Sequence, residues 1–280
     1  MTLLAICQVL ISAQVLGLDR LDAQLLLLHA LGKPPDARSW LLAHDDDSVP
    51  VHVVDLFRGY CLRRAAGEPL AYIVGYKEFF GLRFVVDARV LVPRPDTETL
   101  VQWVLDTAGN MASPDILDLG TGSGAVAMAV AQHAKARVTA TDCSEPALAV
   151  ASHNAALLGA DVQFVHSNWF AKVSGHYHVV ASNPPYIAVD DPHLSALGHE
   201  PLNALTAGPD GLDDVRRIVQ QAPAHLQPGG WLLLEHGYDQ ASAVFDLLTQ
   251  RGFTQVQSRH DLAGIARCTG GRWDNHESNF

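Results

Sequence analysis

Three features are scarce in this sequence: paired cysteines, basic residues and long apolar runs. The four cysteines, Cys7, Cys61, Cys143 and Cys268, form no Cys-x-x-Cys pair. Zinc and dithiol redox sites are therefore not expected, and we predict no metal ion. Free thiols in a reducing compartment are the simpler interpretation, which predicts a cytoplasmic protein.

The shortage of basic residues restricts the possible partners. The chain has 30 acidic against 19 basic residues and a formal net charge of −11. Binding through nucleic-acid phosphates depends on neutralisation by Lys and Arg. The charge balance therefore predicts no stable nucleic-acid partner.

The apolar start of the chain does not have the form of a targeting segment. No Lys or Arg precedes Arg20, and no apolar run reaches the length of a membrane span. We expect neither a signal peptide nor a membrane partner. The length of 280 residues and the 48% hydrophobic content allow one large domain or two ordinary ones.

The N-terminal quarter has the pattern of a small helical domain. Helices are expected at about 2–16, from Asp19 to 32, from Asp36 to 44 and at 51–66, with Asp19 and Asp36 as N-caps. We interpret residues 1–74 as an all-α module for substrate recognition. Residues 75–95 would form a β-hairpin linker, with strands at 76–80 and 82–86.

The segment Pro93-Arg94-Pro95-Asp96 follows the predicted hairpin. Two prolines hold the backbone around Arg94 extended, and Asp96 is expected to cap a helix that runs to about residue 108. The segment is either a rigid linker with a surface arginine or a wall of the active site.

Residues 96–280 alternate between short apolar strands and helices. This alternation predicts an α/β domain with a mostly parallel, doubly wound sheet, closed by an antiparallel hairpin at 255–259 and 264–269. The expected parallel strands are 116–119, 137–141, 162–166, 179–182 and 231–235.

A glycine-rich loop, Gly120-Thr121-Gly122-Ser123-Gly124, joins the first of these strands to a helix. Glycines allow a tight turn and a close approach to a ligand, and Asp142 ends the next strand where a carboxylate could accept both ribose hydroxyls. The Gly-x-Gly-x-Gly spacing differs from the dinucleotide pattern, although the loop alone leaves NAD open. Asp118 would place negative charge near a cationic ligand such as S-adenosylmethionine.

Trp169 follows the third strand at the same edge of the predicted sheet. A tryptophan there either belongs to the core or packs against the adenine of a nucleoside cofactor.

The turn Asn183-Pro184-Pro185-Tyr186 follows the strand at 179–182. Its amide oxygen and the carbonyl of Pro184 could accept the two N–H groups of a planar amide or aromatic amine, and Tyr186 could stack on it. The prolines fix φ and preorganise that carbonyl. Asn183, Pro184 and Tyr186 are the candidate catalytic residues, and Pro185 joins them as a substrate contact.

With these motifs the sequence resembles the HemK/PrmC family, which methylates a glutamine side-chain amide in class 1 peptide chain release factors. The resemblance covers nearly the whole chain and rests on residues 67–73, 93–98, 120–124, 183–187, 200–205, 208–212 and 234–237. It implies the Rossmann-like fold of class I methyltransferases, with S-adenosylmethionine as cofactor and release factors as protein substrates. The target would be the glutamine of a Gly-Gly-Gln loop.

The resemblance also implies roles for individual residues. Gly120 to Gly124, Asp142, Trp169 and Asn183 would bind the cofactor, and Asn183 to Tyr186 the glutamine amide. Asn168 departs from the family, which often has Asp there, so its contact with adenine would differ. Asp96 stands where many members have Glu.

Two other functions remain open at this stage. The Asn-Pro-Pro-Tyr turn is shared with enzymes that methylate adenine N6 in DNA or RNA, although the net charge and the N-terminal helices favour the glutamine branch. A non-catalytic binding module on the same fold is the third possibility, and the intact loop, Asp142 and Asn183 argue against it.

Overall fold

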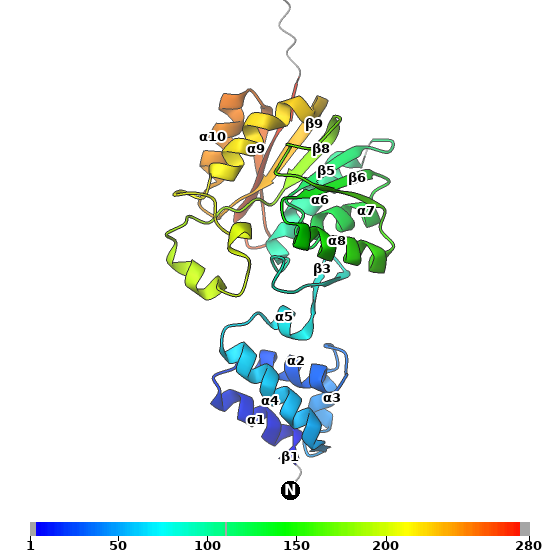
Figure 1. Ribbon diagram of the computed structural model, residues 1–280, viewed down its shortest axis with the longest axis vertical. Coiled ribbons are helices and arrows are strands. Elements are labelled where there is room, and N and C mark those ends of the chain that lie inside the picture. Colours follow the sequence, from blue (N-terminus) through cyan, green and yellow to red (C-terminus); the bar gives the residue numbers. More distant parts are fainter. Residues whose placement is uncertain (1–3, 110, 275–280) are drawn as a thin grey trace, which may run out of the picture. The chain divides into compact units, whose positions relative to one another are not determined.

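The computed structural model describes residues 4–109 and 111–274 and divides into two compact units (Figure 1). One unit comprises Met1–Tyr76 with the short segment Ala196–His199, and the other Lys77–Ser195 with Glu200–Phe280. The functional division into residues 1–74, 75–95 and 96–280 stays a prediction.

The first unit consists mainly of helices. They are α1 (Ile6–Val15), α2 (Arg20–Ala30), α3 (Arg38–Ala43), α4 (Val51–Ala65) and the short α5 (Leu70–Val74). Two-residue strands β1 (Leu4–Ala5) and β2 (Ser48–Val49) pair antiparallel. Apolar side chains from all five helices fill the core, among them Val9, Leu26, Leu27, Leu41, Phe57 and Ile73.

Two details of this unit differ from expectation. Asp19 caps α2 as predicted, because its Oδ1 accepts a hydrogen bond from Asp22 N at 2.8 Å. Asp36 does not cap α3, which starts after Ala37 and has no side-chain cap. The first helix begins later than predicted because Leu4 and Ala5 are extended and pair with Ser48 and Val49.

The predicted hairpin is present as β3 (Tyr76–Phe79) and β4 (Leu82–Val85). Its two-residue turn has positive φ at both positions, +50° at Phe80 and +72° at Gly81, as a tight hairpin turn requires.

The helix after the hairpin starts differently from the prediction. A short 3₁₀ turn, η1 (Pro95–Thr97), precedes α6 (Glu98–Ala108). The backbone of Arg94 is extended as predicted. Asp96 does not cap the helix; its Oδ2 lies 2.9 Å from Arg267 Nη2 in an ion pair.

The second unit contains a seven-stranded sheet in the order β10-β11-β9-β8-β5-β6-β7. Five strands are parallel: β5 (Asp115–Leu119), β6 (Arg137–Asp142), β7 (Val162–His166), β8 (Tyr177–Ser182) and β9 (Leu226–Glu235). β10 (Thr254–His260) and β11 (Ala266–Trp273) run antiparallel at one edge. The predicted doubly wound sheet with a closing hairpin is therefore confirmed.

Helices cover both faces of this sheet (Figure 1). α6 packs beside α7 (Ala125–His133), which in turn contacts α8 (Glu145–Leu158), while α9 (Asp213–Gln221) packs beside α10 (Ala241–Arg251). Alternate strand residues such as Leu117, Val180 and Leu232 form the core under α9 and α10. No helix within residues 4–109 and 111–274 is long and apolar enough to cross a membrane.

Candidate active site

The candidate site lies where the strand order of the sheet reverses. The chain passes from β5 outward to β6 and β7, and then returns to β8 on the other side of β5. Ligands of open α/β sheets bind outside the carboxyl ends of the strands at such a point. Leu119 pairs with Ser182, so the residues that follow, Gly120 and Asn183, emerge side by side.

A cavity of about 440 Å³ lies at this edge of the second unit. It is lined by residues 89–91, 120, 122, 142–144, 146, 147, 167–169, 183, 185, 201, 203, 204, 214 and 217. The structure thus brings Gly120, Gly122, Asp142, Trp169 and Asn183 to one cavity, with Pro185 beside them. Thr121, Ser123, Gly124, Pro184 and Tyr186 are not among its lining residues.

The glycine loop has the backbone that its sequence predicts, with φ at +72°, +55° and +84° for its three glycines. A Cβ on Gly120 would lie 3.3 Å from Cζ3 of Trp169, and a Cβ on Gly124 would lie 2.2 Å from Cε of Met128. Gly120 lets the Trp169 ring approach the loop, and Gly124 lets helix α7 start against its own next turn.

Asp118 precedes the glycine loop and is bonded to it. It is buried and is not among the residues that line the cavity; its Oδ2 accepts a hydrogen bond from Thr121 Oγ1 at 2.6 Å. Burial raises the pKa of Asp118 to about 7, against the effect of the bonds from Thr121 and the backbone of Ala127. Asp118 is therefore tied to the loop through Thr121, and its effect on a cationic ligand stays a prediction.

Asp142 stands at the end of β6 and lines the cavity. Its Oδ2 accepts from Gly122 N at 2.9 Å, and its Oδ1 accepts from Ser144 N at 2.8 Å. Burial raises the pKa of this carboxyl although these backbone bonds act in the opposite direction. Each carboxylate oxygen has two lone pairs, so capacity remains for the hydroxyls of a ribose.

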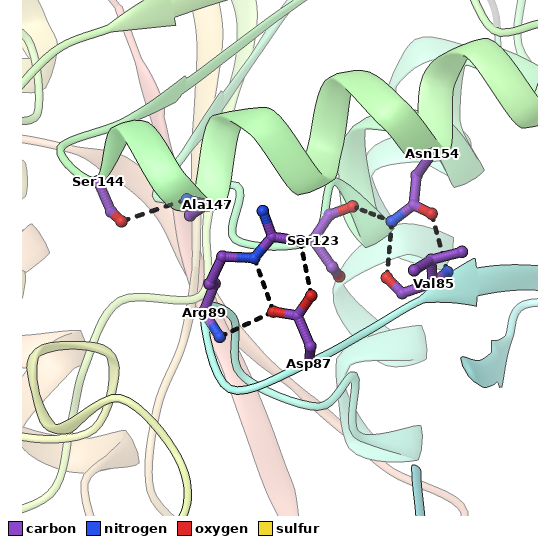
Figure 2. Close-up of polar contacts among 7 residues, drawn as sticks. All are labelled: Val85, Asp87, Arg89, Ser123, Ser144, Ala147 and Asn154. Carbon is purple, nitrogen blue, oxygen red and sulfur yellow. Dashed lines mark hydrogen bonds and ion pairs between the residues drawn. The ribbon is translucent and has the colours of Figure 1, made fainter. Parts of the chain in front are cut away.

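Asn154, which the sequence analysis missed, connects the hairpin to the glycine loop (Figure 2). It is fully buried on α8, and its Nδ2 donates to Val85 O and to Ser123 O, each at 3.0 Å. Val85 N donates to Asn154 Oδ1 at 2.8 Å. One side chain thereby holds strand β4, the loop and α8 together.

The same view shows how Asp87 holds Arg89 (Figure 2), which is one of the residues that line the cavity. Arg89 Nη2 and Nε bond to the two carboxylate oxygens of Asp87 at 2.6 and 2.8 Å. Asp87 follows β4, so the hairpin that Asn154 anchors also carries this cavity-lining arginine.

Trp169 lines the cavity and also packs, partly buried, against the hydrophobic core under α9 and α10. Its backbone has φ +49°, and its Nε1 donates to Asp214 Oδ1 at 3.0 Å. Asp214 belongs to the first turn of α9 and lines the same cavity. The ring is therefore held at its nitrogen, and the indole remains partly exposed beside Gly120.

The turn after β8 is held from several directions. Asn183 Nδ2 donates to Thr97 Oγ1 at 3.1 Å, and Gln240 Nε2 donates to Tyr186 O at 3.0 Å. A Cβ on Gly211, whose φ is +73°, would lie 2.1 Å from Tyr186 O. Burial raises the pKa of the Tyr186 hydroxyl, which therefore stays protonated. Thr97, Gly211 and Gln240 fix the turn, and the sequence analysis gave none of them this role.

Arg94 is paired within this unit. Its guanidinium forms an ion pair with the nearly buried carboxylate of Glu200, which also accepts from Val92 N at 3.1 Å. Glu200 thereby connects the segment after the hairpin to Pro201, which lines the cavity. None of the residues 93–96 is among those that line the cavity, so the choice between a rigid linker and a wall of the active site stays open.

His236 has a structural environment. It is buried, with its Nδ1 2.9 Å from Gly237 O and its Nε2 2.7 Å from Thr269 Oγ1. Burial lowers the pKa of this imidazole. No group of three or more His, Cys, Asp or Glu side chains in the described part of the chain is placed to hold a metal ion.

Solved structures support the fold assignment. A methyltransferase from Pyrococcus furiosus is 20% identical, with a TM-score of 0.55 over 71% of this chain and 92% of that one. The catalytic domain of human Mettl16 is 18% identical, with a TM-score of 0.58 over 77% of this chain and 83% of that one. The second unit therefore has the Rossmann-like fold of class I S-adenosylmethionine-dependent methyltransferases.

Sequence comparisons assign the family. Residues 3–75 match the PrmC N-terminal domain, and residues 95–200 match the methyltransferase small domain. The release factor glutamine methyltransferase of Bordetella pertussis is 49% identical over 91% of this chain and 95% of its own length. Its counterpart in Pseudomonas aeruginosa is 46% identical over 91% and 92%. The chain therefore belongs to the family of release factor glutamine methyltransferases.

Proposed function

We propose that this protein methylates N5 of the glutamine side chain in the Gly-Gly-Gln loop of class 1 peptide chain release factors. The observation that carries the proposal is the meeting of the glycine loop and the Asn183 turn at one cavity, in a chain that matches release factor glutamine methyltransferases along most of its length.

The cavity suits S-adenosylmethionine, which supplies a methyl group on a positively charged sulfur. Gly120 and Gly122 offer close backbone approach, and Asp142 offers carboxylate oxygens for the ribose. Trp169 offers the partly exposed indole for adenine, with Asn168 next to it at the rim. Thr121, Ser123 and Gly124 would act through the shape of the loop, since they are not among the residues that line the cavity.

The Asn183 turn would prepare the acceptor nitrogen. An amide nitrogen is a poor nucleophile because its lone pair is delocalised into the carbonyl. Asn183 Oδ1 and the Pro184 carbonyl would accept its two N–H groups, orient the nitrogen and increase its electron density. Pro185 and Tyr186 would flank the flat amide. Asn183 is not a base, so the proton released after transfer would pass to water.

The structure supports this role through the rigidity of the turn. Pro184 and Pro185 fix their own φ angles. Gln240 bonds to Tyr186 O and to Asp210 O, at 3.0 and 3.2 Å, and its own Oε1 accepts from Gly237 N. Acceptors held in this way need little reorganisation when charge develops on the substrate.

The helical unit would recognise the release factor. Its match to the PrmC N-terminal domain supports this role for residues 1–74, with residues 75–95 as linker and 96–280 as catalytic domain. A substrate of the translation machinery would also agree with a cytoplasmic location.

The proposal is tested by incubating the protein with S-adenosylmethionine labelled in its methyl group, together with either release factor or DNA. We expect label in the release factor and none in DNA. Label in DNA alone would instead establish the adenine-N6 alternative, which the Asn183 turn by itself accommodates equally well.

A further inference from the structure

Two buried side chains hold Asn183 from the side away from the cavity. Thr97 ends η1 and is 4% exposed, and Glu235 ends β9 and is 1% exposed. Neither lines the cavity. β8 and β9 are parallel neighbours with Ser182 opposite Leu234, so Asn183, which follows β8, lies beside Glu235 at the end of β9.

The hydrogen bonds among these three side chains have a fixed polarity. Asn183 Nδ2 donates to Thr97 Oγ1 at 3.1 Å, and the side chains of Thr97 and Asn183 both act on the buried Glu235 carboxyl as donors that lower its pKa. A carboxylate can only accept, and a hydroxyl has one hydrogen to give. Once Thr97 donates to Glu235, its oxygen can only accept, so only the NH₂ end of Asn183 can face this pair.

This polarity matters because the two ends of a carboxamide have nearly the same size and shape. Packing alone would therefore not select between the two orientations of the Asn183 side chain. A flipped Asn183 would present its NH₂ to the NH₂ of the incoming amide, and two donors cannot bond. The acceptor function of the turn requires that Oδ1 face the substrate.

We propose that Thr97 and Glu235 are positioning residues, which fix the Asn183 carboxamide with Oδ1 toward the substrate and make the site selective for a planar NH₂ group. The inference rests on the proposed function, because it assumes that Asn183 accepts a hydrogen bond from the group that is methylated. It assigns a role to Thr97 within the Pro93 to Glu98 motif and to Glu235 within the Leu234 to Gly237 motif.

The energetics of Glu235 support a functional reason for its presence. Burial raises its pKa to about 8; Asp96 acts in the same direction, and Arg267 opposes it. A buried ionisable group is costly, and such groups concentrate at functional sites. Its Oε2 has no hydrogen-bond partner in the described part of the chain. A proton on Oε2 would leave the other oxygen an acceptor for Thr97 in either protonation state.

The test compares Thr97→Val, Thr97→Ser and Glu235→Gln in the full chain. Val has the shape of Thr without the hydroxyl, whereas Ser keeps the hydroxyl. Thr107→Val is the matched control, because the Thr107 hydroxyl bonds only to Trp103 O within α6 in the described contacts. Each variant is measured for kcat and KM with release factor, for cofactor affinity by calorimetry and for thermal unfolding.

We expect Thr97→Val to lower kcat by about 100-fold, the usual effect of losing one preorganised group, while cofactor affinity stays close to wild type. Thr97→Ser should recover most of the rate, and Thr107→Val should match wild type. Glu235→Gln should lower kcat less than Thr97→Val, because the Gln amide can still accept from Thr97 in one of its two orientations.

Two results would overturn the inference. One is a Thr97→Val enzyme with wild-type kcat. The other is an equal loss of kcat in the Thr97→Val and Thr97→Ser variants, because Ser keeps the hydroxyl and the hydroxyl could then not be the cause. Failure of the proposed function is seen separately, because the wild-type protein would then transfer no methyl group to release factor. The same four proteins could in that case be compared on the substrate that wild type does methylate.

Discussion

At the scale of single residues, the proposed methyl transfer depends on how the Asn183 side chain is oriented. Its side chain lines the cavity, and its amide nitrogen is already bonded to Thr97. The Asp142 carboxylate is bonded to Gly122 N in the glycine loop and not to Asn183. Binding of the methyl donor and activation of the acceptor are therefore expected to be separable.

Replacing Asn183 tests this separation. Asn183→Ala should lower kcat by about 10²- to 10³-fold, because one preorganised acceptor is lost. Cofactor affinity, measured by isothermal titration calorimetry, should stay close to wild type. A large loss of cofactor affinity in this variant would mean that Asn183 serves the cofactor and not the substrate amide.

At the scale of elements, the reacting turn is shaped by a loop distant in sequence. Gly211 follows Asp210, and both the Asp210 and Tyr186 carbonyls accept from Gln240. The φ at Gly211 is +73°, and a Cβ added there would lie only 2.1 Å from Tyr186 O, which leaves no room for a larger residue.

Gly211→Ala should therefore displace the turn and reduce turnover strongly. Gly159→Ala is the matched control: Gly159 ends α8 with φ +62°, and a Cβ there meets no atom within 4 Å. Both variants should lose about 1–2 kcal/mol of stability from backbone strain, but only Gly211→Ala should lose methyl transfer. Equal activities, measured with labelled cofactor, would show that the Gly211 contact does not position the turn.

At this scale, much of the fold could be predicted from the periodicity of apolar residues and from the residues that end helices and strands. The parallel strands, the closing hairpin and the tight turn at Phe80-Gly81 follow local patterns that single segments specify. Capping was less predictable: Asp19 caps its helix, whereas Asp96 pairs with Arg267, about 170 positions away in the chain. A capping residue competes with such distant partners, which a local pattern does not contain.

The candidate site likewise has residues that the sequence predicts and residues that it does not. Gly120 and Asn183 directly follow strands and Asp142 ends one, so their meeting at one edge follows from the topology. The sequence gives only a weak indication of the role of Asn154. It is one polar residue on the otherwise apolar face of α8 that contains Val150 and Ala151. The contacts of Gln240 and Gly211 with Tyr186 depend on loop paths that no local pattern specifies.

At the scale of the whole molecule, stability depends on pH through buried carboxyls. The pKa of Asp118 is raised to about 7 in the folded chain, from about 4 when unfolded. Between these values the folded chain holds a proton that the unfolded chain has released. The stability that this group contributes is therefore complete below about pH 4 and is lost as the pH rises to about 7.

Asp118→Asn removes this ionisation. The free energy of unfolding of wild type should fall relative to that of the variant as the pH rises from about 4 to 7, measured by urea denaturation at several pH values. A constant difference between wild type and Asp118→Asn would show that Asp118 titrates normally in the fold.

The two units have separate parts in the account: one carries the cofactor cavity and the reacting turn, and the other matches the PrmC N-terminal domain. We propose that the two units together direct a methyl group to one side-chain nitrogen of a protein.

The most direct measurement is to locate that methyl group by tandem mass spectrometry of release factor treated with the protein and S-adenosylmethionine. The account predicts one added methyl group, on the side-chain nitrogen of the glutamine in the Gly-Gly-Gln loop, and none after treatment with Asn183→Ala. A methyl group on another residue, or an unmodified glutamine beside a methylated nucleic acid, would contradict it.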